Sequence, residues 1–507
     1  MTSRFSAPRT ESSIASQDES STRLSAHHKR NLVWWALAAA ALMALPQLLF
    51  KIATFRRDMS VANRLFPSVP AWSGDERLLI LAPHPDDETL GCGGLIAQAR
   101  RLNIPVRVVF LTNGDGSGST QIGETLRRGK RQTFLELAAM RQGEATAALQ
   151  NLGVAPEDIV FLGFPDGGLM KIWKSHWTDD SPLRSSFTKA DHAPYPNAQT
   201  PNAPYSGQSV VRDIALTIEN FRPTRVLATD GNDTHGDHRA AFSFLLAALE
   251  HLRLQSSTRW AETVEFWTYL VHHAIWPVPH GYRPHEVLAP PHVLTKIGAS
   301  WMARVWDKGA RRAKKTALMC YDSQMTWTPH YLQGFLRRNE LFNRVPQAAN
   351  WPHESSTRSA PITLLRDPTI DSLTRQTFPS TDLTGLSLIT TSQQETICLQ
   401  IGTRLPPSPR CTYTLQLHIL GSNLGASQTF SLEARCDNGI WKTARTDGEF
   451  SSQHFHTDAS SDGLQIDIPL NVLNPHHESV TVLLSSSTRF RGKTLDETST
   501  AALRLNA

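Results

Sequence analysis

The side chains best suited to catalysis in this chain follow a short apolar run, Leu78–Ala82. One imidazole and three carboxylates come within five positions: His84, Asp86, Asp87 and Glu88. Carboxylates crowded in this way repel one another unless a positive charge lies among them. A divalent metal ion is the simplest such charge, and imidazole and carboxylate are both ligands that metal ions accept. The pattern therefore predicts a metal site, with an acidic helix N-cap as the alternative for the carboxylates.

A second polar cluster, residues 230–239, follows the apolar run Arg225–Thr229. Its histidines His235 and His238 are three positions apart. In the first turn of a helix, or in the turn leading into it, that spacing can point both imidazoles at one centre. Taken alone, such a pair is often found on a surface or in a core. Because both clusters directly follow apolar runs, we expect one metal site built from the two.

The elements that must position these clusters alternate along the chain. Apolar runs expected to be strands lie at 78–82, 106–111, 160–164 and 225–229, and helical periodicity lies at 89–102, 127–152, 210–221 and 240–252. This alternation predicts an α/β fold, Rossmann-like, in which a mostly parallel sheet carries helices on both faces. Ligands of such sheets bind beyond the carboxyl ends of the strands, which is where both clusters would lie.

Two motifs within these clusters resemble a known family. Pro83-His-Pro-Asp-Asp-Glu-Thr89, with glycines at 91, 93 and 94 behind it, resembles the signature of the LmbE-like (PIG-L) N-acetylglucosaminyl deacetylases, although many members have Ala where Pro83 stands. His235-Gly-Asp-His238 resembles the second motif of that family. The resemblance covers residues 76–345, which we expect to be a LmbE-like deacetylase domain. Weaker similarities lie at 111–115, 141–154, 164–169, 321–324 and 337–342.

The resemblance implies hydrolysis of the N-acetyl amide of an N-acetylglucosamine-type sugar or its conjugate, which yields free amine and acetate. It makes His84, Asp87 and His238 the ligands of one Zn²⁺ ion, for which another divalent transition metal could substitute. It makes Asp86 the general base that takes a proton from the attacking water. A protonated His235 would polarise the substrate carbonyl and stabilise the oxyanion.

Three further residues are weaker candidates for substrate binding: Arg141, Asp237 and His272. Arg141 matches a family position associated with substrate contact, but an ion pair with Glu144 on a helix surface is the alternative. Asp237 is suited to orient an imidazole or to act as an N-cap. His272 and His273 lie in a segment similar to one seen in some family members, and they are expected to line the pocket.

Residues 171–207 form a long irregular stretch that contains Trp173, Trp177, Tyr195 and Tyr205. Loops of this length in a compact domain usually serve binding. The four aromatic side chains are therefore expected either to stack on a sugar ring or to pack on the domain surface.

Three other residues or runs are interpreted as structural. Glu88 is expected to cap a helix or to tune the site, and Cys92 to be a small buried residue. The run Gly114-Asp-Gly-Ser-Gly-Ser119 superficially suggests a phosphate-binding loop, but it lacks the full dinucleotide-binding fingerprint.

The N-terminal region predicts a membrane protein. Residues 1–30 are rich in Ser and Thr and are expected to form a disordered tail. Residues 31–52 are expected to be a transmembrane anchor, because 32–50 is almost wholly apolar, begins near a Trp-Trp pair and has basic flanks. A cleaved signal peptide and a buried core helix are the alternatives. Basic residues are nearly equal in number before and after the span. The side of the membrane on which the catalytic domain of this single-pass membrane protein lies therefore stays open, with the extracytoplasmic side preferred.

Beyond residue 345 the composition changes. Residues 346–386 are expected to be a linker. In 387–507, short alternating apolar runs are separated by Gly, Asn, Asp and Ser, which predicts an all-β sandwich accessory domain whose partner the sequence does not identify. A pair among its three cysteines could form a disulfide in an oxidising compartment.

Length and charge limit the remaining choices. The 507 residues are too many for one ordinary core, and a net charge of +5 without any basic stripe interleaved with aromatic residues argues against a nucleic-acid partner. The expected partners are an N-acetylated amino sugar and a membrane. Two other functions stay open: a non-catalytic, membrane-anchored binding or scaffold protein, and an amidase of the same mechanism that acts on a non-sugar amide.

Overall fold

The computed structural model describes residues 34–35, 44–61, 64, 66–72, 74–116, 131–351, 361–389, 395–446 and 455–506. The chain divides into two compact units, Met1–Arg56 and Arg57–Ala507. In the first unit the described residues are helical. The second unit contains the α/β sheet and the β-rich region.

The predicted membrane anchor at 31–52 is contradicted. Among the described residues, no helix combines the length and the apolar composition that crossing a bilayer requires. The described helical stretch 44–61 carries Lys51, Arg56, Arg57 and Asp58, which are costly in a bilayer. The rest of the predicted span, apart from 34–35, lies outside the described residues, as does the predicted tail at 1–30. The prediction of a single-pass membrane location was therefore wrong.

The α/β part contains one seven-stranded sheet. In spatial order its strands are β3 (Ile159–Phe164), β2 (Val106–Thr112), β1 (Leu78–Ala82), β4 (Arg225–Thr229), β5 (Glu265–Tyr269), β7 (Asn339–Arg344) and β6 (Trp301–Val305). The first five are parallel to one another, whereas β7 runs antiparallel to both β5 and β6. This confirms the predicted mostly parallel sheet and adds an antiparallel edge that the sequence analysis did not predict.

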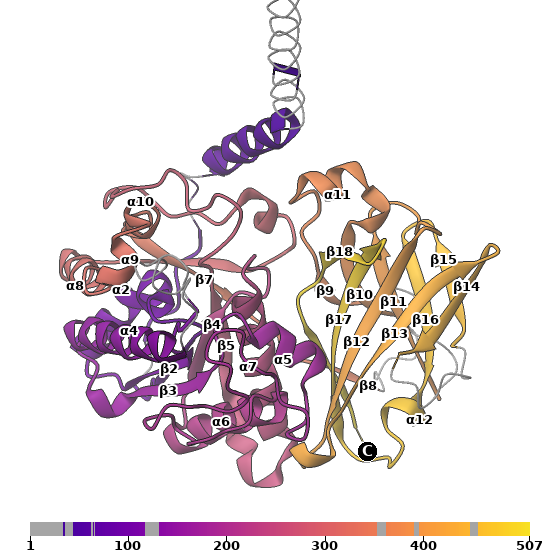
Figure 1. The fold of residues 1–507 in the computed structure, drawn as a ribbon, viewed down its shortest axis with the longest axis horizontal. Coiled ribbons are helices and arrows are strands. Elements are labelled where there is room, and N and C mark those ends of the chain that lie inside the picture. Colours follow the sequence, from indigo (N-terminus) through magenta and orange to yellow (C-terminus); the bar gives the residue numbers. More distant parts are fainter. Residues whose placement is uncertain are drawn as a thin grey trace, which may run out of the picture. The chain divides into compact units, whose positions relative to one another are not determined.

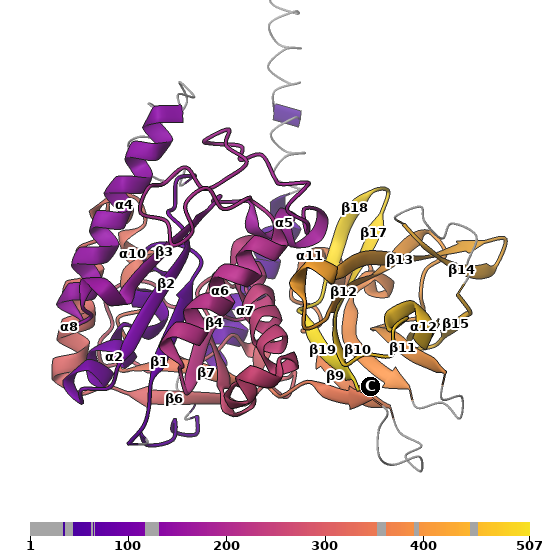
Figure 2. The same cartoon turned by 90° about the horizontal axis from the view of Figure 1, so that it is seen from below.

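Helices cover both faces of the sheet, as predicted (Figures 1 and 2). One face is covered by α2 (Asp87–Arg101), α4 (Arg131–Asn151) and α8 (Lys308–Leu318), and the other by α5 (Leu169–Ser175), α6 (Gly207–Phe221) and α7 (Gly236–Leu254). Leu78 and Ile80 of β1 pack into the first layer, and Leu79 and Leu81 into the second. Burial on both faces explains why β1 is a continuous apolar run rather than an alternating one.

The connections contribute several short helices. These are the 3₁₀ helices η1 (Pro156–Asp158), η2 (Ser256–Thr263) and η3 (His292–Thr295), and the α-helices α9 (Asp322–Met325) and α10 (Pro329–Gln333). The order of the strands reverses at β1, which lies between β2 and β4. The carboxyl ends of β1 and β4 are therefore neighbours at the switch point of the sheet, where α/β proteins bind their ligands.

The C-terminal region is a sandwich of two sheets (Figure 1). One sheet contains β15 (Thr457–Ser460), β16 (Gly463–Pro469), β11 (Thr396–Thr403), β10 (Leu383–Ile389) and β9 (Ile362–Arg366). The other contains β14 (Ile440–Arg445), β13 (Gln428–Asp437), β12 (Cys411–Leu420), β17 (Val480–Phe490), β19 (Ala501–Leu505) and β8 (Ala349–Trp351), with β18 (Lys493–Glu497) paired to β17. The short helices of this region are α11 (Leu373–Thr377), η4 (Pro379–Thr381), η5 (Leu424–Ala426) and α12 (Leu470–Leu473).

Strands β8 and β9 lie within 346–386, the stretch predicted to be a linker. The domain boundaries themselves stay predictions. All five cysteines are free, so the possible disulfide does not form in this structure.

The sandwich packs against the helical layer that contains α7. Leu420, Leu483 and Ala502 of the sandwich belong to the same buried cluster as the core residues of α5, α6 and α7. Glu250 of α7 also accepts a hydrogen bond of 2.7 Å from Nε of Arg504 on β19. The α/β sheet and the sandwich thus share part of one apolar interior.

The four aromatic residues singled out in the 171–207 stretch lie in this interior. Trp173, Trp177, Tyr195 and Tyr205 are all buried, with at most 7% of any of them exposed. The indoles of Trp173 and Trp177 pack against His418 of β12, with ring centroids 4.0 and 4.7 Å away. Side chains buried in this way cannot stack on a sugar, so that hypothesis was wrong, and the packing alternative was closer.

Candidate metal centre

The residues of the candidate site follow the ends of two neighbouring strands. After β1, Pro83 stops the strand and His84 enters the pocket, and helix α2 then begins at Asp87 with Asp86 as its N-cap residue. The backbone of Asp86 has a φ of 120°, a region that residues with a side chain rarely occupy. After β4, the loop 230–235 leads into α7, whose N-cap is His235.

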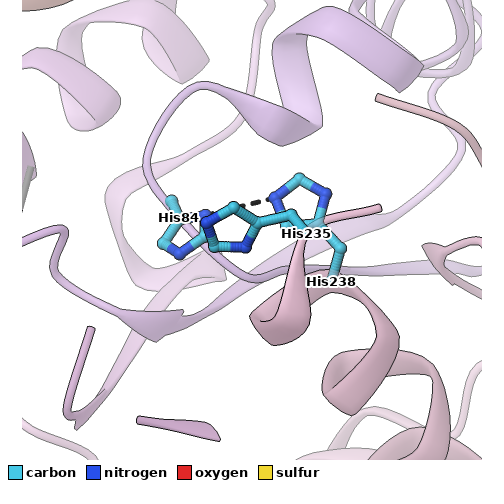
Figure 3. A group of neighbouring side chains, drawn as sticks. All are labelled: His84, His235 and His238. Atoms are coloured by element: carbon cyan, nitrogen blue, oxygen red, sulfur yellow. Dashed lines mark hydrogen bonds between the residues drawn. The ribbon is translucent and has the colours of Figure 1, made fainter. Parts of the chain in front are cut away.

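Three ligand atoms from these two segments form an equilateral triangle. Nδ1 of His84, Oδ2 of Asp87 and Nε2 of His238 are each 3.2 Å from the other two. Figure 3 shows the imidazoles of His84 and His238 facing one another, with His235 beside them. Two ligands of a tetrahedral zinc ion, each about 2.0–2.1 Å from the metal, lie about 3.3–3.4 Å apart. The triangle therefore fits the ligand set of a divalent metal ion.

The outer nitrogen of His238 is held by a carboxylate. Nδ1 of His238 lies 3.0 Å from Oδ2 of Asp233, and the same oxygen accepts hydrogen bonds from the backbone N–H groups of Val271 and His272. Burial would raise the pKa of Asp233, but His238 lowers it below its usual value, so the carboxylate is ionised. This arrangement keeps the proton of His238 on Nδ1 and leaves Nε2 free as a ligand.

The outer nitrogen of His84 is held in the same way by two carboxylates. Nε2 of His84 lies 3.2 Å from Asp237 and 3.3 Å from Asp166. Asp237 is itself fixed, because it accepts hydrogen bonds from the backbone N–H groups of Gly167 and Leu169. Both imidazoles of the triangle thus have carboxylate partners on the far side, the pattern that orients histidine ligands in metal sites.

The negative charge around the triangle calls for a cation. Burial alone would lower the pKa of His238, but Asp87 and Asp233 raise it to about 10. Burial would likewise lower the pKa of His84, but its carboxylate partners, Asp166 first among them, raise it well above its usual value. These shifts show that the carboxylates stabilise positive charge at this point, as a metal-binding cluster must.

The neighbouring carboxylates Asp86 and Asp87 differ in their environment. Burial, together with the negative charge of Asp87, raises the pKa of Asp86 to about 8. Burial would also raise the pKa of Asp87, but His238 and His84 hold it well below its usual value. Two adjacent carboxyl groups with opposite shifts can perform different tasks, one as a ligand and one as a proton carrier.

His235 is positioned as a neutral imidazole. Its Nδ1 accepts a hydrogen bond of 3.2 Å from the backbone N–H of Asp237, so a neutral ring carries its proton on Nε2. Burial and the nearby His84 and His238 lower its pKa. The prediction of a protonated His235 is therefore not supported, although a neutral imidazole can still donate from Nε2.

Arg141 holds the backbone of the site and makes no ion pair with Glu144. Its guanidinium donates to the carbonyl oxygens of Pro85 at 2.6 Å and Gly114 at 3.2 Å. It also lies 3.9 Å from a carboxylate oxygen of Asp86. Glu144 instead accepts hydrogen bonds from Ser323. The surface ion-pair alternative for Arg141 was therefore wrong.

Glu88 has a structural environment, as expected. It is fully buried and accepts hydrogen bonds from the hydroxyls of Thr89 and Tyr321, each at 2.5 Å, and from the backbone N–H of Asp86 at 3.2 Å. These contacts fix the start of α2.

A pocket of about 320 Å³ opens over these residues. Its walls include Asp86, Asp87, Arg141, Asp166, His84, His235, His272 and Tyr331. His272 is held by Tyr331, whose hydroxyl donates to the carbonyl of Val271 and lies 2.8 Å from Nδ1 of His272. Burial, followed by the charge of His238, lowers the pKa of His272 to about 4. The volume is within the range of small-ligand sites, so we name this cavity the His84 pocket.

The structure brings the candidate residues of the sequence analysis together. Those that line the His84 pocket are His84, Asp86, Asp87, Arg141, His235 and His272, while His238 and Asp237 lie directly behind its wall. His273 is buried and does not line the pocket.

Sequence reasoning missed three participants: Asp166, Asp233 and Tyr331. The first two lay in segments that had been singled out, 164–169 and 230–239, and each follows a strand.

Among the described residues, three groups of side chains around the site have potential ligand atoms within 4.8 Å of one another: His84–His235–His238, Asp87–His238–His272 and His84–Asp166–Asp237.

The part of the chain that carries both strand ends of the site matches a known family. The family described as GlcNAc-PI de-N-acetylase (PIG-L) matches residues 79–249, a range that includes both strand ends of the site. A 1D-myo-inositol 2-acetamido-2-deoxy-alpha-D-glucopyranoside deacetylase from Mycobacterium sp. (strain KMS) is 35% identical over 188 residues, which cover 35% of this chain and 52% of that protein. The chain thus spans about half the length of this relative.

Two other proteins extend the comparison. A deacetylase with the same description from Rhodococcus opacus (strain B4) is 29% identical over 271 residues, covering 50% of this chain and 84% of that protein. Among solved structures, the N,N'-diacetylchitobiose deacetylase from Pyrococcus horikoshii is 18% identical, with a TM-score of 0.34 over 54% of this chain and 84% of that chain.

Proposed function

Because residues 79–249 form a domain of the PIG-L family, we propose that this protein is a metal-dependent deacetylase of N-acetylglucosamine-type sugars or their conjugates. The reaction would hydrolyse the N-acetyl amide to a free amine and acetate. The observation that carries the proposal is the triangle of His84 Nδ1, Asp87 Oδ2 and His238 Nε2, with all three sides at 3.2 Å, at the floor of a polar pocket.

We assign the metal to this triangle and name Zn²⁺ as the first candidate. Two imidazoles and one carboxylate form a common ligand set for catalytic zinc, which leaves coordination positions open for water and substrate. A bound zinc ion would supply the positive charge that polarises the amide carbonyl and eases deprotonation of the attacking water. Asp233, Asp166 and Asp237 would hold the two imidazoles in the required orientation.

Asp86 is assigned as the proton carrier. It lines the His84 pocket and lies outside the ligand triangle, so its carboxylate is available to the reacting groups. It would take a proton from the attacking water and return one to the nitrogen of the leaving amine, which cannot depart as an anion at neutral pH. Arg141 would keep Asp86 in place through the carbonyl of Pro85 and through its charge.

His235 is assigned as the donor to the oxyanion. Its ring lies edge-on to that of His84, with centroids 4.9 Å apart, and its Nδ1 is already engaged by the helix backbone. The Nε2–H of a neutral imidazole would therefore donate to the oxygen on which charge develops. His272 and Tyr331 line the same pocket and are candidates for contacts with the sugar.

The decisive experiment measures acetate release by the zinc-loaded protein and by its Asp86→Asn variant. The substrates are 1D-myo-inositol 2-acetamido-2-deoxy-α-D-glucopyranoside and N,N'-diacetylchitobiose, with acetylated non-sugar amines alongside. We expect deacetylation of at least one sugar, and a loss of about 10²–10⁴-fold in kcat for D86N with the zinc content unchanged. The control is Glu157→Gln, an exposed carboxylate outside the pocket.

The two alternative functions predict different results. A wild-type protein that binds zinc but releases acetate from no substrate would support the binding or scaffold function. Turnover of only the non-sugar amides would support the amidase. Equal activity of D86N and the wild type would show that the assignment of Asp86 is wrong.

A further inference from the structure

A second pocket, of about 350 Å³, is lined by cations. Helix α8 contributes Lys308, Arg311, Arg312, Lys314 and Lys315, and the other walls come from Tyr282, Pro284, His285, Leu336 and Arg337. We name this cavity the α8 pocket. Among the described residues, no Asp or Glu belongs to its lining, so the charged side chains that line it are all cationic.

The cations of α8 are arranged on one side of the helix. Lys308, Arg311, Arg312 and Lys315 stand at positions i, i+3, i+4 and i+7, which place them on one face. The helix contains no acidic residue, so no carboxylate separates these like charges. Like charges at such spacings destabilise a helix. A ligand with several negative charges would remove that cost.

Two of the six cations of the pocket are neutralised by nearby carboxylates. Lys314 pairs with Glu340 at 2.7 Å, and Arg337 pairs with Glu286 at 2.7 Å. Within the part of the chain that the structure describes, Lys308, Arg311, Arg312 and Lys315 have no carboxylate in ion-pair range. Lys315 instead places its Nζ over the ring of Tyr282, 4.5 Å from the centroid. The α8 pocket therefore holds about four positive charges that no carboxylate compensates.

The guanidinium of Arg311 uses only some of its hydrogen-bond donors. One terminal nitrogen donates to the carbonyl oxygen of Pro284 at 2.7 Å, which fixes the side chain against the pocket wall. Its Nε atom is buried and has no hydrogen-bond partner among the described residues. A buried N–H without a partner is costly, and an oxyanion is the acceptor that a guanidinium binds best.

We propose that the α8 pocket binds a phosphate or diphosphate group. Arg311 and Arg312 would offer planar donors to its oxygens, and Lys308 and Lys315 would neutralise its charge. Tyr282 and His285 add hydrogen-bonding groups to the walls. The volume suits a small oxyanion and excludes a folded polymer. The site is separate from the His84 pocket, so the proposal does not depend on the deacetylase assignment.

A diphosphate could be free or carried by a sugar. Leu332 lines the His84 pocket and Leu336, four residues later, lines the α8 pocket, so the two cavities flank one segment of the chain. Inorganic pyrophosphate and uridine diphosphate N-acetylglucosamine are therefore both used as probes. If uridine diphosphate N-acetylglucosamine displaces pyrophosphate, the pocket recognises a phosphate group carried by a larger molecule. If only pyrophosphate binds, the ligand is the free ion.

The test is isothermal titration calorimetry of pyrophosphate against the full chain, with ³¹P NMR as a second readout. We expect saturable binding below about 1 mM. The triple variant K308Q/R312Q/K315Q should bind at least one hundredfold more weakly, since each charge-assisted contact contributes about tenfold. These three side chains are exposed, and removing their repulsion should leave α8 stable. Circular dichroism and thermal unfolding verify the fold.

The matched control is R410Q/R491Q/K493Q, which lowers the net charge by the same amount at exposed positions of the sandwich. Its affinity for pyrophosphate should equal that of the wild type. An absence of binding to the wild type, or an equal loss of affinity in the two triple variants, would overturn the proposal. Because binding is measured without turnover, a protein that lacks deacetylase activity still gives a clear result.

Discussion

Arg239, the residue after His238, is bonded to Glu497 at the end of strand β18 in the β-sandwich. Its guanidinium lies 3.4 Å from a carboxylate oxygen of Glu497 and donates to the carbonyl oxygens of Glu497 and Thr498 at 3.3 and 2.9 Å. Glu497 also pairs with Lys174 of α5 at 2.6 Å. The sandwich thus holds the first turn of the helix that carries His235 and His238.

Replacing Glu497 by Gln should therefore reduce deacetylation. The contacts of Arg239 would weaken, the start of α7 would gain freedom, and kcat should fall about tenfold, because small misplacements of reacting groups are costly. Zinc content should stay near that of the wild type. The control is Glu433→Gln, which breaks ion pairs with Arg435 and Arg489 elsewhere in the sandwich. Equal losses in the two variants would contradict a role of Glu497 in positioning.

Asp233→Asn should weaken metal binding. The substitution removes the negative charge opposite Nδ1 of His238, and loss of such a carboxylate partner typically costs 10–100-fold in metal affinity. Competition with a chromogenic chelator measures the change directly. Asp213→Asn serves as the control, because Asp213 is another buried carboxylate, bonded to Thr200 on the side of α6. Wild-type zinc affinity in the D233N protein would contradict the role of Asp233 in orienting His238.

His418 should make the protein less stable in mild acid. Burial lowers the pKa of His418 to about 3, and neither ring nitrogen has a hydrogen-bond partner among the described residues. An unfolded chain takes up this proton near pH 6.5. The contribution of the neutral, buried His418 to the free energy of unfolding is therefore fully present above that pH and is lost as the pH falls towards 3. At pH 5 this proton uptake by the unfolded chain lowers the free energy of unfolding by about 2 kcal/mol.

The measurement is the free energy of unfolding in urea at pH 7.5 and pH 5, for the wild type and for His418→Leu. The variant should lose about 2 kcal/mol less than the wild type between the two pH values. His476→Gln, at an exposed position, should behave as the wild type does. Parallel losses in the wild type and in H418L would rule out His418 as the source.

The buried pair of Lys314 and Glu340 should show strong coupling. Lys314 of α8 also donates to the carbonyl oxygen of Leu90, and Glu340 of β7 accepts from the backbone N–H groups of Gly94 and Leu95. Lys314→Met would leave a buried carboxylate without its counter-ion, at a cost of about 3–5 kcal/mol. The double variant K314M/E340Q should recover part of this loss. Additive effects in urea unfolding would disprove the coupling.

Local sequence patterns were sufficient to predict where the site lies. Strand β1 is buried on both faces, so it is a continuous apolar run, and the residues that follow it must emerge at the edge of the sheet. The same reasoning holds for β4 and the histidines behind it. Because parallel strands present their carboxyl ends at one edge, the two polar clusters could be expected to meet there. The choice of His84, Asp87 and His238 as the ligands came from the family resemblance and not from the strand pattern.

Contacts that depend on packing between distant segments could not be predicted in this way. Whether Arg141 bonds to Glu144 or to the carbonyl of Pro85 is decided by the rotation of α4 about its axis. The same limitation applies to Asp166, which reaches His84 from the loop after β3. The stretch 171–207 resembled a binding loop because the burial of Trp173 and Trp177 against the sandwich leaves no local periodic signal.

The backbone at Asp86 determines which variant can report on its chemistry. With φ at 120°, any residue that carries a Cβ is strained there, and Asn is better tolerated in positive-φ conformations than Ala. An Ala variant would therefore alter the conformational preference of the turn as well as remove the carboxylate, and its rate would mix two causes. Asn keeps the shape of Asp and its tolerance of the turn, so D86N isolates the loss of one ionisable oxygen.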